Sequence, residues 1–281
     1  MYKARPYHHI PIHDSGEPLV EIPLDKFTVI SPHPYQQVGA SYPDYSPYHL
    51  RQGVVDRLCL AQDYLQTLQP GWKLAIFDGY RPVAVQKFMV EHTFEELVQA
   101  KGWQRDNLTP EQSESLWELV HQIWAVPNYD RATPPPHSTG GAVDLALADE
   151  TGMIIDFGSP IDEISERSHP DYYAHNSPLR LRSVTTLRLR SLLYERLRQR
   201  QAQGIAVTAP QESLTVSLSN CSVTVDTQNQ TYHQQRLLLK AVMTQAGFQR
   251  HPGEWWHFCY GDQMWAWLSE ATTAIYGRVE V

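Results

Sequence analysis

The sequence predicts an α+β protein in which helices pack on a small, mainly antiparallel sheet. In some segments apolar residues recur at helical spacing, and in others they alternate with small or polar residues as strands do. The two kinds of segment follow one another irregularly. The expected helices span 54–68, 82–92, 109–124 and 236–246, and the expected strands span 73–77, 143–147, 153–157 and 255–260.

Proline, glycine and capping residues set the ends of these elements. Residues 1–50 are rich in Pro, Tyr and His with little periodicity, so we expect extended chain that wraps around the core. Pro70-Gly71 ends the first helix, and Pro82 suits the first position of the second. The segment 109–112 has capping-box spacing, which predicts the start of the third helix.

The strand 143–147 has a functional consequence. Its apolar residues alternate with alanines and with Asp144, so the Asp144 side chain should point away from the apolar face. A turn at 149–152 would return the chain as the strand 153–157. Later, Gly247 ends the last helix, and the strand 255–260 follows.

Residues 176–231 are interpreted as a subdomain inserted into a single domain that spans 1–281. Seven arginines against one acid lie between 179 and 200, with leucines at helical spacing. We expect a helix with a solvated basic face; the alternative is a helix that binds an anionic partner or a membrane surface. Apolar alternation on both sides of Ser219-Asn220 predicts a hairpin.

Composition narrows the function classes. The formal net charge of −8 argues against nucleic-acid binding. Three scattered cysteines without a CxxC pair exclude a disulfide framework and fit a reducing compartment. The N-terminus lacks the apolar run of a signal peptide, and no stretch is long enough to span a bilayer. We therefore expect a cytoplasmic protein, and a homo-oligomer stays open.

His137 and Asp144 are candidate metal ligands. Gly140-Gly141 lies between them and permits a tight turn, so that a loop histidine and a strand aspartate can reach one ion. Imidazole and carboxylate both suit Zn²⁺. The alternative is a loop histidine beside an aspartate that caps a turn.

Glu254 and His257 complete the candidate zinc site: His257 offers a third ligand, and Glu254 offers a further carboxylate beside it. Three protein ligands with a free carboxylate nearby are typical of a catalytic zinc site. On an ideal strand, residues three apart face opposite sides, so both reach one metal only if the chain bends near Pro252-Gly253. Alone, this short motif is as compatible with tryptophan packing in the core. Together the two motifs indicate a zinc hydrolase.

Arg81 lies in a predicted strand-to-helix turn, a common position for functional side chains. It can bind a substrate carboxylate or stabilise the oxyanion of a tetrahedral intermediate. The alternative is a structural salt bridge with Asp78 or another acid.

These residues resemble the D-alanyl-D-alanine dipeptidases, a family of zinc D,D-peptidases related to the D,D-carboxypeptidases and the Hedgehog fold. The resemblance covers about 54–172 and 232–262. The family pattern S-x-H-x-x-G-x-A-x-D matches at His137, Gly140, Ala142 and Asp144, and the pattern E-x-W-H matches at Glu254, Trp256 and His257. The element D-G-Y-R-P matches Asp78 to Pro82. A further element, an acid followed by S-E-R-S-H, matches Asp162 with Ser165 to His169.

The resemblance implies one Zn²⁺ per chain, held by His137, Asp144 and His257. It implies that Glu254 is the general base and later protonates the leaving amine, that Arg81 stabilises the oxyanion, and that Asp162 recognises the substrate's amino group. The implied reaction is hydrolysis of D-alanyl-D-alanine to two D-alanines. Wall-fragment recycling and glycopeptide resistance fit equally well as its role.

Two departures and two alternatives accompany the resemblance. Pro135 replaces the serine of the first pattern. The family's N-terminal tyrosine has no unique match among four candidates, which are Tyr35, Tyr42, Tyr45 and Tyr48. The alternatives are a murein D,D-carboxypeptidase that acts on longer peptides and a non-catalytic zinc-binding module. An intact Glu254 argues against the second.

Overall fold

A central five-stranded sheet organises the protein. The computed structural model describes residues 5–174 and 218–280, so the predicted basic segment 179–200 lies outside the described residues. The strand order is β2-β4-β5-β7-β6. Only the β2–β4 pair is parallel, which confirms a mainly antiparallel sheet. The strands are β2 (Thr28–Val29), β4 (Lys73–Asp78), β5 (Ala142–Ala148), β6 (Gln249–Arg250) and β7 (His257–Cys259).

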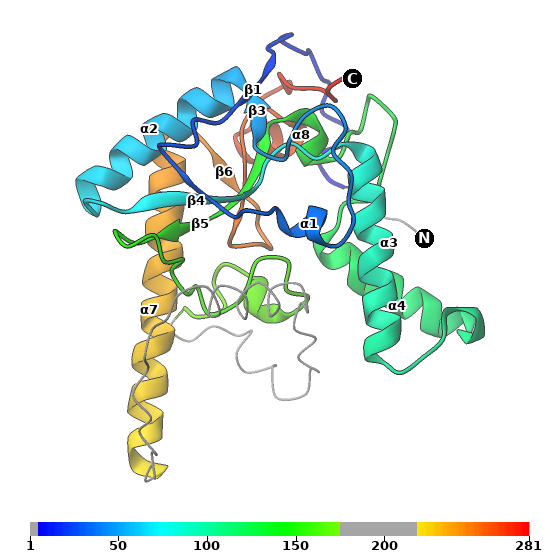
Figure 1. The fold of residues 1–281 in the computed structure, drawn as a ribbon. Helices are drawn as coiled ribbons and strands as arrows, with labels where there is room; N and C mark the ends of the chain where they lie inside the picture. The colour runs from blue at the N-terminus through cyan, green and yellow to red at the C-terminus, as the bar shows by residue number, and fades with distance from the viewer. Residues whose placement is uncertain (1–4, 175–217, 281) are drawn as a thin grey trace.

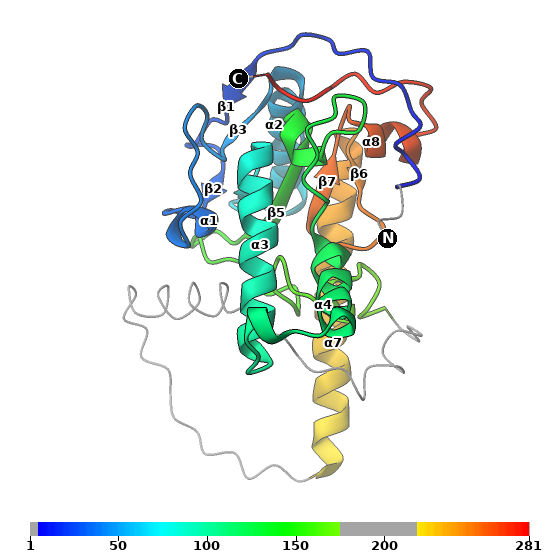
Figure 2. The same cartoon turned by 90° about the vertical axis from the view of Figure 1, so that its right-hand side faces the viewer.

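Two pairs of helices flank the sheet. Figures 1 and 2 show α2 (Gln52–Leu68) beside the upper part of α7 (Leu218–Gln245) on one side of the molecule. On the other side, α3 (Val83–Ala100) lies beside α4 (Pro110–Ile123). The predicted capping box of α4 is present, with Thr109 and Gln112 each bonding to the other's backbone N–H. The α+β class is thus confirmed.

The middle strand β5 is buried along its whole length. From Val143 onward its apolar side chains belong to the main core, together with residues of α2, α3 and α7. The alternation of apolar residues with alanines and Asp144 therefore identifies a strand, but neither face of this strand is exposed to solvent. This burial means that Asp144, in the middle of the core, needs partners for its charge.

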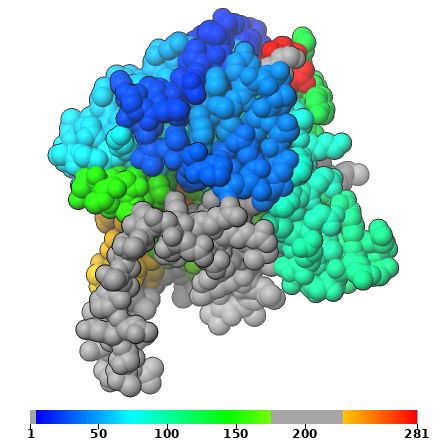
Figure 3. Space-filling view, in the orientation of Figure 1, coloured from blue at the N-terminus to red at the C-terminus, as the bar shows by residue number. Residues whose placement is uncertain are grey.

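The N-terminal chain wraps around the sheet as expected. Its regular pieces are short: β1 (Leu19–Glu21) pairs with β3 (His49–Arg51), and α1 (Pro34–Gln37) is a single turn. Figure 3 shows this blue chain spread over one face of the molecule. Near the C-terminus, the short helix α8 (Gln263–Leu268) follows β7. In the described ranges, three 3₁₀ turns lie at Arg105–Asn107, Pro136–Thr139 and Glu166–Ser168.

Several element boundaries differ from the predictions. The segment 153–157 is not a strand, because only Ile154 forms a bridge, to Ala148. The hairpin around Ser219-Asn220 is wrong for 218–225, which belong to the long helix α7. Adding residues to an existing helix costs little, so a few alternating valines do not stop it. The last strand is shorter than 255–260, and α3 runs eight residues beyond its predicted end at His92.

Within the described ranges, no helix combines the length and apolar character that crossing a lipid bilayer requires.

Candidate metal and catalytic site

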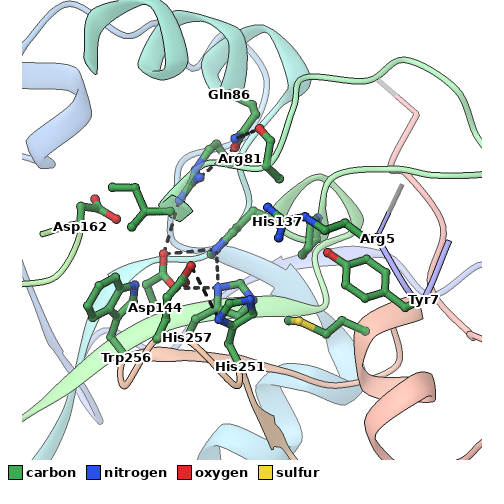
Figure 4. A pocket seen from close by; sticks show the side chains of 15 residues that line it. Arg5, Tyr7, Arg81, Gln86, His137, Asp144, Asp162, His251, Trp256 and His257 are labelled. Atoms are coloured by element: carbon green, nitrogen blue, oxygen red, sulfur yellow. Dashed lines mark hydrogen bonds and ion pairs between the residues drawn. The ribbon is translucent and has the colours of Figure 1, made fainter. Parts of the chain in front are cut away.

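The three predicted metal ligands converge on one point. His137 Nε2 lies 3.2 Å from His257 Nδ1 and 3.2 Å from Asp144 Oδ2, and His257 Nδ1 lies 2.9 Å from Asp144 Oδ1. All three side chains are buried. Figure 4 shows them pointing toward one another from separate segments. Two imidazoles and a carboxylate within 4.8 Å of one another match the donor set of a three-ligand zinc site.

Strand register brings Asp144 and His257 together. They are direct partners in the β5–β7 pair, and Asp78 of β4 lies opposite Asp144 on the other side. An irregularity in β4 makes this possible, because Ile76 and Asp78 face the consecutive residues Leu145 and Asp144. Such a bulge re-aims the side chains that follow it. The His33 ring hydrogen bonds to the carbonyl of the extra residue, Phe77, at 2.9 Å.

His137 is placed by a turn and by the end of β4. Gly140 ends this turn at φ 71°, a left-handed conformation that glycine adopts without steric cost. Three bonds tie the turn to the neighbouring loop: His137 Nδ1 to Gly79 O (2.8 Å), Arg81 N to His137 O (3.2 Å) and Ser138 Oγ to Arg81 O (2.8 Å). Since a carbonyl only accepts, His137 Nδ1 carries the proton, and its Nε2 lone pair faces the site.

The Asp144 carboxylate is held in its charged form. Burial opposes the charge, but the adjacent imidazoles of His137 and then His257 hold the Asp144 pKa well below its ordinary range. His137 and His257 present ring nitrogens to this carboxylate and to each other. The cluster therefore offers lone pairs and negative charge at one buried point, which a divalent cation would satisfy.

Glu254 reaches the same cavity because the chain bends where expected. Pro252 and Gly253 form the bend between β6 and β7, and His251 N donates to His257 O at 2.9 Å across its base. His251 Nδ1 also accepts from Gly253 N (3.2 Å) and lies 3.7 Å from Glu254 Oε1. Glu254 thus precedes the strand. Burial raises its pKa to about 8, with His257 acting in the opposite direction.

The two tryptophans between Glu254 and His257 pack in the core, which was the alternative interpretation of this motif. Trp255 stacks on Phe157 at 4.3 Å between ring centroids, and its Nε1 donates to Ser159 Oγ at 2.9 Å. Trp256 is 1% exposed, and its carbonyl accepts from Leu145 N at 3.1 Å. These contacts fix the loop that presents Glu254.

Arg81 makes the salt bridge that was considered as its alternative role, and it also lines the cavity. Its Nε donates to Asp78 Oδ2 at 2.8 Å, its Nη1 to Gln86 Oε1 at 2.8 Å, and its Nη2 to the Tyr35 hydroxyl at 3.2 Å. The same Nη2 lies 3.4 Å from Asp144 Oδ2. The guanidinium is therefore locked in place beside the ligand cluster.

Asp162 lines the cavity beyond Arg81. Its Oδ2 accepts from the Tyr35 hydroxyl at 2.7 Å. Burial, and then the charge of Asp144, raise the pKa of Asp162 to about 7, against the effect of Arg81. The loop that carries Asp162 is held by Arg236 of α7, whose side chain donates to Phe157 O (2.7 Å) and His169 O (2.8 Å). Tyr35 thus connects Arg81 to Asp162, which distinguishes it from the other three candidate tyrosines.

All six predicted site residues line one cavity of about 510 Å³, together with residues that the motifs did not indicate. Among these further lining residues are Arg5, Tyr7, Gln86 and His251. Gln86 lies on the first turns of α3 after Arg81, so helical geometry alone could have suggested it. Nothing in the sequence indicates that Arg5 and Tyr7, more than 70 residues before Arg81, reach the same cavity.

Comparison with known proteins identifies the family of the chain. A peptidase M15 family model, described as D-Ala-D-Ala dipeptidase, matches residues 29–190 and 216–274. The chain is therefore a peptidase by family. More narrowly, it belongs to the D-Ala-D-Ala dipeptidase family.

Three relatives carry the name D-alanyl-D-alanine dipeptidase. The Synechocystis protein is 44% identical over 98% of this chain and 97% of its own length. The Escherichia coli protein is 28% identical over 67% of this chain and 55% of its own length. The Enterococcus faecium protein is 25% identical over 69% of this chain and 64% of its own length.

Proposed function

We propose that the protein hydrolyses D-alanyl-D-alanine to two D-alanines with one zinc ion held by His137, Asp144 and His257. The observation that carries the proposal is the convergence of these donors in a cavity that also contains Glu254 and Asp162. The shared name of the relatives supports the substrate. A bound zinc ion would supply Lewis acidity at the scissile carbonyl and lower the pKa of the attacking water.

Glu254 supplies the proton transfers. It takes a proton from the attacking water as the new C–O bond forms, and it delivers a proton to the leaving amine as the C–N bond breaks. Burial in the cavity raises its pKa to about 8, against the effect of His257, which makes it a stronger base than an exposed glutamate. Its place in a bend, with its backbone fixed by neighbouring tryptophans, keeps the carboxylate beside the ligand cluster.

Arg81 and Asp162 supply the charges that the substrate and the reaction need. Arg81 is preorganised by four partners and stabilises the oxyanion that develops on the carbonyl. Asp162 offers a carboxylate to the substrate's ammonium group. The positive charge of that group would favour the ionised form of Asp162. An acid at this position selects a peptide with a free amino end.

The test is hydrolysis by the purified protein. After treatment with a chelator and reloading with one equivalent of zinc, the protein should release D-alanine from D-alanyl-D-alanine, and the chelated protein should not. The same preparation is then given an acylated tripeptide that ends in D-alanyl-D-alanine. Faster turnover of the blocked peptide would replace the dipeptidase by a D,D-carboxypeptidase, and no turnover of either would leave a zinc-binding module.

Three further expectations stay predictions at this point. They are the cytoplasmic location, the role, for which wall-fragment recycling and glycopeptide resistance fit equally well, and the oligomeric state, for which a homo-oligomer stays open.

A further inference from the structure

We propose that Arg5 binds the C-terminal carboxylate of the substrate and so selects a free dipeptide at its carboxyl end. This inference rests on the proposed dipeptidase function. Arg5 lines the cavity that contains Glu254 and the three candidate ligands. It comes from the wrapping N-terminal chain and lies outside every motif of the sequence.

Arg5 differs from Arg81 in its freedom to bind an anion. Arg81 has each of its nitrogens bonded to protein partners. The Arg5 side chain, within the ranges that the structure describes, makes one hydrogen bond, from Nη2 to the carbonyl of His121 at 3.2 Å. A guanidinium has five N–H donors in a fork that matches a carboxylate. Arg5 therefore has donors left for a substrate.

The position of Arg5 is complementary to that of Asp162. Figure 4 shows the two side chains on opposite sides of the ligand cluster, with Asp162 beyond Asp144 and Arg5 beyond His137. A free dipeptide carries an ammonium at one end and a carboxylate at the other, with its single peptide bond between them. With the ammonium at Asp162 and the carboxylate at Arg5, the peptide bond lies between the two charges, where the ligand cluster and Glu254 are.

The backbone around Arg5 is anchored well enough to hold this position. His8 N donates to Arg5 O at 3.1 Å, which makes a turn, and the Gln263 side chain donates to Ile10 O at 2.6 Å. Further along, His13 N donates to Ala274 O at 2.8 Å. Tyr7, which is 8% exposed, packs in a small apolar cluster that includes Met264 and Ala142.

Electrostatics agree with a cation facing the reacting groups. Burial dominates the raised pKa of Glu254, and the charge of Arg5 is among the influences that lower it. The same charge contributes to the lowered pKa of His251, where burial and then His257 dominate. The positive charge of Arg5 therefore acts on ionisable groups inside the cavity, namely Glu254 and His251.

Arg5 also lies at the boundary of a second cavity. It lines this neighbouring hollow together with Tyr7, Ala125 and Pro136, and all four residues line the first cavity as well. A peptide extended beyond its second residue and into the second cavity would have to pass this shared boundary, of which Arg5 is part. The same side chain can thus bind the terminal carboxylate and limit the substrate's length.

The experiment compares D-alanyl-D-alanine with its C-terminal amide, which has no negative charge. The zinc-loaded wild type should prefer the acid, and Arg5→Gln should lower kcat/KM for the acid about 10- to 100-fold, as expected for a lost charge-assisted hydrogen bond. The amide should be cleaved by both proteins at similar rates. Arg5→Lys should restore part of the preference, and Arg105→Gln, which changes an exposed arginine paired with Glu91 and Glu95, should leave it unchanged.

The ratio of the two rates separates binding from folding. A structural defect in Arg5→Gln lowers turnover of acid and amide together, so an unchanged ratio overturns the role of Arg5. If the wild type cleaves neither compound, the dipeptidase function fails first, and this inference fails with it. If the wild type cleaves the acid while Arg5→Gln keeps the full preference, only this inference is wrong.

Discussion

Arg81 and Asp78, three residues apart, form a buried ion pair in which Arg81 Nη2 lies 2.7 Å from Asp78 Oδ2. The Asp78 side chain is fully buried and also lies 3.3 Å from His33 Nε2 and 3.5 Å from His137 Nδ1. Burial opposes its charge, but Arg81 and then His33 hold the Asp78 pKa below its usual value. One carboxylate thus contacts both the Arg81 guanidinium and the candidate ligand His137.

Asp78→Asn should destabilise the protein, because it leaves the buried Arg81 charge without its main counter-ion. Removal of one partner of a buried pair typically costs about 3–5 kcal/mol. We expect a loss in this range in the free energy of unfolding of the metal-free protein, measured in urea. Asp106→Asn, at an exposed position, is the control. Equal stability of the two variants would show that the pair contributes little.

Glu254→Gln should abolish most of the activity and leave cation binding intact. The amide keeps the shape of the side chain but cannot accept the water's proton, and general-base groups contribute about 10²- to 10⁴-fold to rates. We expect kcat to fall within this range, with zinc content by elemental analysis unchanged. Glu118→Gln, at an exposed position of α4, is the matched control. Full activity in Glu254→Gln would remove Glu254 from the mechanism.

The activity should fall as the pH is lowered. Burial raises the Glu254 pKa to about 8 from 4.5, against the effect of His257, and a cation bound nearby would lower it again by favouring the carboxylate. The acid limb of kcat/KM should therefore have its midpoint between these two values. Below the midpoint Glu254 is protonated and cannot act as base, so the rate drops tenfold per pH unit. The residual rate of Glu254→Gln should lack this limb; its persistence would assign the limb to another group.

Tyr35→Phe should weaken substrate binding. The hydroxyl donates to Asp162 and accepts from Arg81, so its loss frees the Asp162 carboxylate to move. We expect KM for the dipeptide to rise about tenfold, as for a lost hydrogen bond to a charged group, with a smaller change in kcat. Tyr45→Phe is the comparison, because the contacts described for Tyr45 involve its ring. A KM like that of the wild type would exclude Tyr35 from positioning Asp162.

The residues of the candidate site that belong to sequence motifs could be predicted from the sequence. His137, Asp144 and His257 were recognisable because two short motifs combine ligand types with a glycine turn and a bend. Tyr35 was one of four equal candidates, since only the folded chain shows that it contacts both Arg81 and Asp162. Arg5 had no local signal at all, because its place depends on contacts with the chain near Ala274.

The fold was predictable where local patterns and packing agree. The capping box of α4 and the alternation in β5 predicted those elements to within one residue at each end. The alternation near Val223 predicted a hairpin and was wrong, because the helix that packs on α2 extends back through this segment. The bulge at the end of β4 had no sequence signal, although it decides where Asp78 points.

With the proposed zinc site, the pairing of Asp144 with His257 would make metal uptake a measure of correct folding. A shift of β5 by one residue would turn the Asp144 carboxylate to the opposite face of the sheet. Such a molecule can keep its helices and much of its apolar core, so circular dichroism would not detect it. It cannot bring the three donors together, however. The zinc content of a preparation should therefore report the fraction of molecules whose strands have paired in the native register.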